Sequence, residues 1–579
     1  MRTDALYRYD LDFVKGLAIM AVVLYHAGWC KSGYLGVDVF FVINGYLVAP
    51  KVMNEIAEGR FRYWSFLEKK LFRLLPLVLL VNFFALLVGY WEMLPGDYRY
   101  LSEEAVAASF FGDNILEAIV TQNYWAAIYH KILMHTWFLG VLFQFYVVFP
   151  LLMMLMRRRM ENTLIILTIF SLLLYLLPID SIGDKYYLLP YRFFELSVGG
   201  FIALRPSRIS SQICCASFVC ILLMLFFGAF TIGERAMPYN LEGGTNTIRE
   251  SFLPREIILL LIVSFTVLFL FYKSETAFFR RSRILSPLGR MSLSIFLWHQ
   301  PLIAFYRYLY ADDLSVAVLF SVCILTLILS FISYRFVEQK IRISLTSRLL
   351  LIIAFTVVVL FALRIYQQGG VVRDVPELDI KKGLFDPGAF ERYTDRIYMY
   401  NHDFSKEDGR RKILVIGNSF ARDFANILLE SPDSARIQIS YHPGFGGCPM
   451  NRIRQCDRIY YFGWKHQVPD SVWSNVKKGT EIWGIGTKNH GKSNGIFYKN
   501  RNRGDYFNQR VAIHNDFHQV NHILRDEWGS HYVDLMSLTQ QPDGTFPVFT
   551  PDHHFITYDG KHLTPAGTIY YMKQMYKQK

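Results

Sequence analysis

Apolar runs about as long as a membrane-spanning helix recur through the first 366 residues, and none follows them. A helix needs about 20 mostly apolar residues to cross the hydrocarbon core of a bilayer. The sequence therefore predicts a polytopic α-helical membrane domain of about 11 transmembrane helices, followed by a soluble domain. The predicted spans lie near residues 14–30, 34–50, 71–91, 135–156, 162–178, 190–204, 211–232, 256–272, 290–309, 314–334 and 349–366.

The basic residues cluster between these runs and account for a net charge of +13. With the N-terminus inside the cell, the inner connections hold most of the Lys and Arg, including Arg157, Arg158 and Arg159, as the positive-inside rule requires. A further apolar patch at 105–120 would move this triplet outside if it crossed the membrane. Residues 93–134 are therefore expected to form an interfacial segment or loop. Nucleic acid is not expected as a partner, because no basic patch accompanies a binding motif.

The chain is expected to divide into three parts. Residues 1–345 form the membrane domain, 346–370 a linking transmembrane helix, and 371–579 an extracytoplasmic domain. In the last part, "KILVIG", "IQISYH", "EIWGIG" and "HYVDLM" read as strands separated by helical stretches, which predicts an α/β fold with a parallel sheet. Cys448 and Cys456 are predicted to form a disulfide there, with two free thiols as the alternative.

Lys15 and His26 are ionisable residues inside the first apolar run, "KGLAIMAVVLYHAG". Eleven residues of helix place them about 20° apart around the axis and about 16 Å apart along it. With Asp12 they form one face, which would hold an anion near the inner surface and an acid–base group near mid-membrane. The alternative is a snorkelling lysine and a structural histidine. Other polar residues in the spans predict an internal polar cavity, with the candidates Asp38, Trp137, Arg192, Glu195 and His299.

The order of these motifs resembles acyltransferase family 3 of multi-spanning membrane proteins, over about residues 8–345. After the first run come "GVDVFFVINGYL", "RLLP", "HTWFL" and "LWHQPL", in that sequence. The resemblance implies transfer of an acyl group, commonly acetyl, from cytoplasmic acyl-CoA to a carbohydrate outside. His26 would handle protons or the acyl group, and Lys15, Lys70 and Arg73 would hold the donor phosphates. Asn44 stands where the family usually has Ser, and Leu142 where it usually has Glu, so no role is carried over from that carboxylate.

In the soluble part, Ser419 follows the strand "KILVIG" and begins a helical stretch, where amide groups suit an oxyanion. In "YDGKH" the three-residue spacing lets Asp559 orient His562, which completes the parts of an activated nucleophile. Residues 410–575 resemble the SGNH hydrolase superfamily, which implies a flavodoxin-like sandwich with Ser419 as nucleophile. The resemblance also implies Gly447 and Asn489 as oxyanion-hole residues.

The expected function is O-acylation, commonly O-acetylation, of an envelope carbohydrate of lipopolysaccharide, exopolysaccharide or peptidoglycan type. Acyl-CoA is the expected donor substrate, and no bound cofactor or metal is expected, although His553, His554 and His562 are close enough in sequence to raise a metal site as an alternative. The expected location is the inner membrane, with the N-terminus in the cytoplasm, the C-terminal domain outside it and lipid as a further partner. The alternatives are a transporter of carbohydrate or lipid-linked sugar with a binding tail, and a membrane-anchored carbohydrate esterase.

Overall fold

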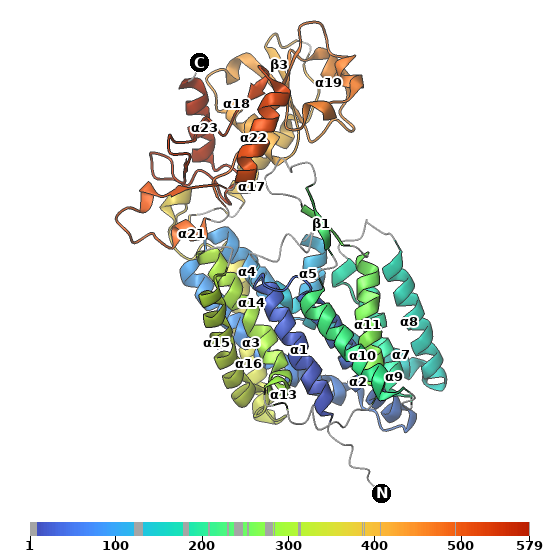
Figure 1. Ribbon diagram of the computed structural model, residues 1–579. Helices are drawn as coiled ribbons and strands as arrows, with labels where there is room; N and C mark the ends of the chain where they lie inside the picture. The colour runs from blue at the N-terminus through green and yellow to red at the C-terminus, as the bar shows by residue number, and fades with distance from the viewer. Residues whose placement is uncertain are drawn as a thin grey trace. The chain divides into compact units, whose positions relative to one another are not determined.

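A computed structural model describes residues 8–120, 131–177, 185–205, 209–228, 231–236, 247–251, 254–272, 282, 284–310, 314–384, 386, 388–405, 407–491, 494–513 and 515–577. The chain divides into two compact units (Figure 1). The first, here called the membrane unit, comprises residues 1–232 and 251–370. The second, the soluble unit, comprises residues 233–250 and 371–579.

Every predicted span of the membrane unit coincides with a helix. Six helical segments among the described residues are long and apolar enough to cross a membrane, judged by length and composition. The prediction of a helical membrane domain is thus confirmed. The helices are α1 (Tyr9–His26), α2 (Gly36–Ala57), α3 (Tyr63–Glu92), α7 (Trp137–Leu155), α8 (Met160–Leu176), α9 (Leu189–Ala203), α10 (Ser211–Leu222), α11 (Arg255–Phe271), α14 (Ser292–Leu309), α15 (Val316–Ser333) and α16 (Leu345–Gln367).

Short turns of helix connect these elements, and a small two-stranded sheet lies mostly within residues 233–250, which belong to the soluble unit. Two π-helical turns, η5 and η6, extend α10 and α15. The short elements are η1 (Gly33–Leu35), η2 (Met134–Thr136), η3 (Arg157–Arg159), η4 (Lys185–Tyr187), η5 (Leu223–Phe227), η6 (Tyr334–Glu338), α13 (Leu285–Arg290) and the strands β1 (Thr231–Ala236) and β2 (Thr247–Ser251).

Helix α1 packs against α13, α2 and α14, and α2 packs along α9. Two glycines allow these close approaches. A Cβ on Gly289 of α13 would lie 1.7 Å from the Asp12 carbonyl oxygen, and one on Gly45 of α2 would lie 1.7 Å from the Leu196 carbonyl oxygen. Small residues at such crossings let helix backbones meet directly in a membrane.

Residues 95–120 form two helices packed in the membrane unit, so the loop expected there is wrong, while the other alternative, an interfacial segment, stays a prediction. Helix α4 (Pro95–Ser109) packs between α3 and α16, and the Tyr98 hydroxyl donates a hydrogen bond to the Leu86 carbonyl (2.8 Å). Helix α5 (Asp113–Val120) packs against α7. The serines and carboxylates of α4 make its mean hydropathy too low for a span, and α5 is only 8 residues long. Residues 121–130 lie outside the described part.

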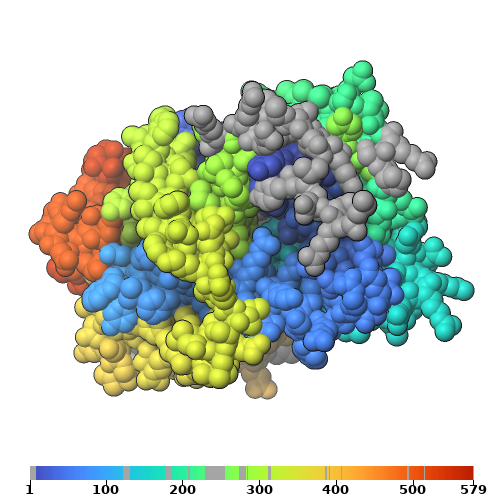
Figure 2. Space-filling view, turned by 90° about the horizontal axis from the view of Figure 1, so that it is seen from below, coloured from blue at the N-terminus to red at the C-terminus, as the bar shows by residue number. Residues whose placement is uncertain are grey.

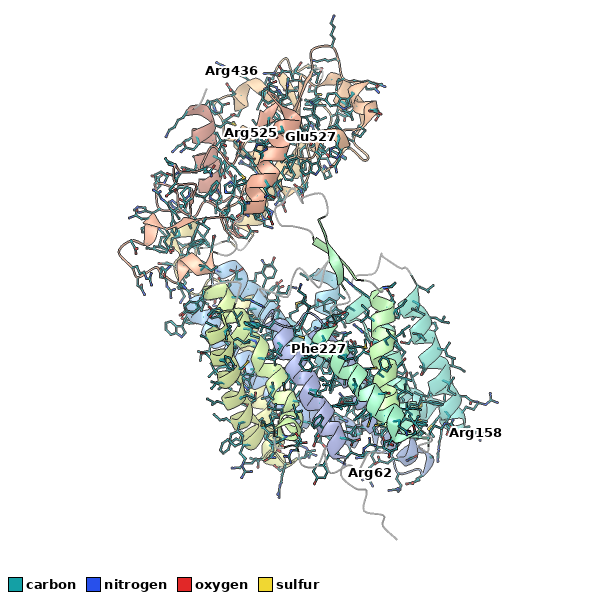
Figure 3. All side chains as sticks on the ribbon, viewed as in Figure 1. Arg62, Arg158, Phe227, Arg436, Arg525 and Glu527 are labelled. Atoms are coloured by element: carbon teal, nitrogen blue, oxygen red, sulfur yellow. The ribbon has the colours of Figure 1, made fainter. Side chains whose placement is uncertain are left out.

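The two ends of the membrane unit meet on one face. Figure 2 shows residues from the start of the unit (blue) beside residues from its end (yellow), in keeping with the packing of α3 against α16. Arg62, which precedes α3, and Arg158 of η3 lie at the same end of the helical bundle (Figure 3). Both belong to the connections predicted to be inside.

The soluble unit is built on a five-stranded parallel sheet in the order β4-β3-β5-β6-β8. Numbered along the chain, this order is 2-1-3-4-5, that of the flavodoxin-like doubly wound fold. The prediction of an α/β fold with a parallel sheet is confirmed. The strands are β3 (Arg411–Ile416), β4 (Ile437–His442), β5 (Arg458–Tyr461), β6 (Glu481–Ile485) and β8 (Tyr532–Val533).

Strand β3 alternates its side chains between two hydrophobic layers. Ile413 and Val415 join the layer that contains α18 (Ser419–Leu429) and α23 (Pro565–Lys577). Leu414 and Ile416 join the opposite layer, with α19 (Met450–Gln455) and α22 (Asn515–Trp528). The smaller elements are α17 (Ala389–Asp395), α20 (Asp470–Trp473), α21 (Gly495–Tyr498), the 3-10 turns η7 (Pro376–Leu378), η8 (Arg396–Tyr400), η9 (Ser434–Arg436), η10 (Lys465–Gln467) and η11 (Tyr506–Asn508), and the antiparallel pair β7 (Arg510–Val511) and β9 (Phe546–Pro547).

The predicted disulfide of the soluble unit is not formed. Cys448 and Cys456 are both free and buried in the same hydrophobic layer. Helix α19 separates them along the chain, and the Cys456 thiol donates a hydrogen bond to the Ile453 carbonyl (3.2 Å). Both cysteines serve here as small apolar core residues.

Candidate active site

A sharp turn between β3 and α18 presents Ser419 at the carboxyl end of the sheet. Gly417 has φ 137°, and a Cβ there would lie 3.0 Å from the side chains of Ala421 and Phe462, so only glycine fits without strain. The Asn418 side chain caps α18 by accepting a hydrogen bond from the Phe420 amide (3.0 Å). In the sheet, β3 lies between β4 and β5, the next two strands along the chain, so the strand order reverses direction at β3. Ser419 follows β3 and therefore lies at the topological switch point, where open α/β sheets bind ligands.

Ser419, His562 and Asp559 meet in a hydrogen-bonded chain. The His562 Nε2 lies 2.9 Å from the Ser419 Oγ, and its Nδ1 lies 2.6 Å from an Asp559 carboxylate oxygen. Ser419 and His562 are half-buried and Asp559 is exposed, so the hydroxyl is accessible. This is the arrangement in which a histidine takes the serine proton while an aspartate fixes its orientation.

The Asp559 carboxylate also organises the loop that carries it. Its other oxygen accepts hydrogen bonds from the amides of Lys561 (2.9 Å) and His562 (2.8 Å). Desolvation opposes ionisation of this carboxyl group, but the hydrogen bonds and charge of His562 outweigh it and hold the pKa of Asp559 well below its usual range. Asp559 therefore remains ionised, and able to accept hydrogen bonds, over the whole pH range in which a histidine can act as a base.

The two residues expected to form the oxyanion hole, Gly447 and Asn489, lie in different loops, one with open space beside it and one buried. Gly447 lies in the loop between β4 and α19 with φ 79° and open space where a Cβ would point. Asn489 is buried after β6, and its side-chain oxygen accepts a hydrogen bond from the Gly491 amide (2.9 Å). Their roles stay predictions.

The histidines raised as metal ligands point to different partners. His553 stacks on Phe507 with ring centroids 4.0 Å apart, and the His554 Nε2 lies 3.7 Å from an Asp379 carboxylate oxygen. In the described part of the chain, no three His, Cys, Asp or Glu side chains are grouped so as to hold a metal ion.

In the membrane unit, the structure brings together the three basic residues expected to bind the donor. Arg73 lies within electrostatic range of both Lys15 and Lys70. The Lys15 Nζ is 3.9 Å from an Asp12 carboxylate oxygen, and the Lys70 Nζ lies 4.2 Å from the centre of the Tyr146 ring. The basic cluster thus combines groups from α1 and α3 and presents several positive charges.

Three histidines form a second cluster, more than two helical turns farther along α1. His26 is the last residue of α1 and is buried, in a helix that also packs against η1 and α2. Its ring centroid lies 5.1 Å from that of His299, which lies 5.7 Å from that of His135. Gln300 hydrogen-bonds His26, and Arg307 is within electrostatic range.

The histidine cluster contains unsatisfied polar atoms. Among the described residues, the Nδ1 of His26, both ring nitrogens of His135 and the Nε2 of His299 are buried without a hydrogen-bond partner. Buried polar groups normally have partners, so these nitrogens have unused hydrogen-bonding capacity. His135 was not among the predicted site residues, although it lies two residues before Trp137 in the "HTWFL" motif.

The remaining membrane candidates form a buried charge cluster. An Arg192 nitrogen lies 3.0 Å from an Asp38 oxygen and 2.7 Å from a Glu195 oxygen, and all three side chains are 0% exposed. The Tyr186 ring stacks under the guanidinium at 4.1 Å and contacts Trp137, with ring centroids 4.8 Å apart. The Asn44 oxygen accepts a hydrogen bond from the Tyr146 hydroxyl (3.3 Å), and Leu142 is a buried apolar residue.

Comparison with known proteins identifies the family of the membrane unit. "Putative membrane-bound transacylase BcsY" of Komagataeibacter xylinus is 26% identical over 336 residues, which cover 57% of this chain and 82% of that protein. "O-acetyltransferase OatA" of Staphylococcus aureus is 28% identical over 367 residues, which cover 58% of this chain and 57% of that protein. No solved structure matches. The family model described as an acyltransferase domain matches residues 8–335, more than half of the chain. The chain belongs to acyltransferase family 3 and is a multi-pass membrane acyltransferase.

Proposed function

We propose that this protein takes an acyl group, most simply acetyl, from cytoplasmic acyl-CoA and transfers it to a carbohydrate hydroxyl outside the membrane. The observation that carries this proposal is the Ser419–His562–Asp559 chain of hydrogen bonds in a protein whose membrane unit belongs to an acyltransferase family. A nucleophile of this kind forms and breaks esters. Transfer to an oxygen is proposed because a related S. aureus protein is named an O-acetyltransferase, and carbohydrate is the acceptor that the resemblance of the sequence motifs implies.

The basic cluster supports a role in holding the donor. An acyl-CoA carries several phosphates, and Lys15, Lys70 and Arg73 offer cations from two helices. In the proposed course of the reaction, the acyl group then reaches His26. Its unpartnered ring nitrogen can accept a proton or the acyl group itself. The free thiol of the donor leaves on the inner side.

Ser419 supports the second half of the reaction. Its Oγ attacks the acyl carbonyl while the Ser419 proton passes to the His562 Nε2. The bond from the acyl carbon to its carrier, the His26 nitrogen or the donor thiol, breaks, and His562 gives the proton up to that leaving group and becomes neutral again. A sugar hydroxyl then attacks the acyl-serine. Its proton goes to His562, the ester bond to Ser419 breaks, and His562 returns a proton to the serine oxygen. Asp559 keeps the imidazole oriented through both steps.

The proposal is tested by the ester content of surface polysaccharide in cells that express the protein. We expect Ser419→Ala and His26→Ala to lose the added ester, while Ser471→Ala, at an exposed serine of the same unit, keeps it. Full acylation in both active-site variants would overturn the proposal.

The two alternatives make different predictions. A sugar transporter would keep its function in Ser419→Ala, and family membership already favours the acyltransferase. A membrane-anchored esterase would remove esters from an acylated glycan without any donor. Incubating the purified full chain with acylated and unacylated glycan, with and without acetyl-CoA, separates the esterase from the transferase.

A further inference from the structure

One ion pair of the soluble unit is buried beside the catalytic residues. The Lys488 Nζ lies 2.7 Å from an Asp423 carboxylate oxygen, and the two side chains are 0% and 2% exposed. Among the described residues of this unit, no other ion pair has both partners this deeply buried. Asp423 lies one turn after Ser419 on α18, and Lys488 lies in the segment that follows β6.

This pair contacts the loop that carries His562 on both sides of that histidine. The same Asp423 oxygen accepts a hydrogen bond from the Leu563 amide (3.0 Å), directly after His562. The Lys488 ammonium donates a hydrogen bond to the Lys561 carbonyl, directly before His562. It also lies 4.1 Å from the centre of the Phe420 ring, next to Ser419. The pair therefore joins the helix of the nucleophile, the strand end at β6 and the loop of the base.

Stability alone does not explain such a pair. Removing two charges from water costs energy, and apolar side chains of similar volume often replace a buried pair without loss of stability. Apolar replacements, however, cannot hold a backbone amide and a backbone carbonyl at fixed positions. What this pair adds is a defined geometry between α18 and residues 561–563.

We propose that Lys488 and Asp423 are positioning residues that set the distance between the Ser419 hydroxyl and the His562 imidazole. The inference rests on the proposed role of Ser419 as nucleophile. The pair acts through the backbone of Lys561 and Leu563 and does not touch the reacting atoms. Misplacement of a reacting group by about 1 Å lowers rates by up to about 100-fold, so loss of the pair should slow the chemistry at Ser419 without preventing folding.

The test measures how fast a fluorophosphonate labels Ser419 in the purified full-length protein. We expect the double variant Lys488→Met/Asp423→Leu to show a maximal labelling rate at least 30-fold lower, with the half-saturating probe concentration unchanged. Asp423→Asn keeps the side-chain shape and should slow labelling about threefold to tenfold. Arg452→Met, which removes the Arg452–Asp403 pair (2.8 Å) elsewhere in the unit, should label at the native rate. Ser419→Ala gives the background.

A native maximal rate in a folded double variant would overturn the proposal. If the double variant does not fold, Asp423→Asn decides, and a native maximal rate in it would overturn the proposal equally. Failure to label Ser419 in the native protein would instead overturn the nucleophile assignment on which both proposals rest. The two failures are therefore distinguishable in one experiment.

Discussion

The two units bury charge in different ways. In the membrane unit, one guanidinium, that of Arg192, faces the carboxylates of Asp38 and Glu195, and each of the three keeps one atom without a hydrogen-bond partner in the described structure. In the soluble unit, Lys488 and Asp423 form a one-to-one pair whose two groups also bond to the backbone. A cluster with unequal numbers of positive and negative groups and unsatisfied atoms, such as that of Arg192, is suited to a site that acts on an entering group. A fully hydrogen-bonded one-to-one pair, such as Lys488 with Asp423, is suited to holding backbone segments in a fixed geometry.

The reactive groups show the same contrast. The histidine cluster of the membrane unit is buried and has unpartnered nitrogens. The triad of the soluble unit is a complete hydrogen-bonded chain that solvent can reach. The soluble site therefore has its hydrogen bonds in place, while the membrane site has unused hydrogen-bonding capacity. The predictions below test this difference, from the largest expected effect to the smallest.

The largest expected effect is a loss of acyl transfer, which can be distinguished from a loss of Ser419 reactivity. Ser419→Ala and His26→Ala should each lower acyl transfer at least about 1,000-fold, because each removes a group that acts directly in one half of the reaction. Only Ser419→Ala should abolish labelling by a fluorophosphonate, which needs the triad alone. Both properties are measured on the purified full chain. Loss of serine labelling in His26→Ala would show that the two sites are not separate.

The buried charge cluster of the membrane unit should be sensitive to single substitutions. Arg192→Met leaves two carboxylates buried without a cation, which costs about 3–5 kcal/mol. The triple variant with Asp38→Asn and Glu195→Gln removes the net charge and should recover part of that stability. Thermal inactivation of detergent-solubilised protein measures both. Equal melting temperatures for Arg192→Met and the native chain would contradict the account.

Acid should destabilise the soluble unit through His490. Its Nδ1 lies 2.8 Å from the Pro547 carbonyl and its Nε2 lies 2.7 Å from the Tyr571 hydroxyl, an arrangement that fits a neutral ring. Burial lowers the pKa of His490 to about 4, although the Pro547 hydrogen bond opposes this. The unfolded chain binds the proton more readily below about pH 6.5. Stability should therefore fall by up to about 3 kcal/mol as the pH drops from about 6.5 towards 4.

Pulse proteolysis of the full chain in urea, following fragments that contain β6, measures this dependence. His490→Gln should flatten it, because glutamine does not titrate. His402→Gln, at an exposed histidine, should leave it as in the native protein. If the stability of His490→Gln depended on pH as steeply as that of the native protein, the acid sensitivity would belong to another group.

The smallest effect concerns the cysteines of the soluble unit. Burial raises the pKa of the Cys456 thiol to about 12, so it should react very slowly with iodoacetamide at neutral pH. After rapid unfolding without reductant, Cys448 and Cys456 should both become alkylated, as peptide mass spectrometry would show. Alkylation that required prior reduction would restore the disulfide that the sequence predicted.

Much of this molecule could be predicted from its sequence because the signals are local. Long apolar runs specified the helices, and "KILVIG" with Ser419 and "YDGKH" with Asp559 and His562 specified the triad. Strand β5 was missed because "RIYY" is short and begins with a charge. Helix α4 was missed because its polar side chains lower the mean hydropathy, and α5 was missed because it is too short to cross a membrane.

Features made by long-range contacts could not be predicted in this way. His26, His135 and His299 come from three helices far apart in the chain, and only packing brings them together. Lys488 and Asp423 are likewise separated by three strands, and neither belongs to a recognisable motif. The Cys448–Cys456 pairing failed for a related reason, since spacing along the chain does not set the direction of the thiols.

The most direct test of the account is the fate of the acyl group itself. The purified full chain in lipid nanodiscs is incubated with radiolabelled acetyl-CoA and no acceptor, and then digested and mapped. The account predicts an acetyl ester on the peptide that contains Ser419 in the native protein, and none in His26→Ala or Ser419→Ala. A native protein without label at Ser419, or a His26→Ala variant that still carries it, would contradict the proposed passage of the acyl group from the membrane unit to the serine.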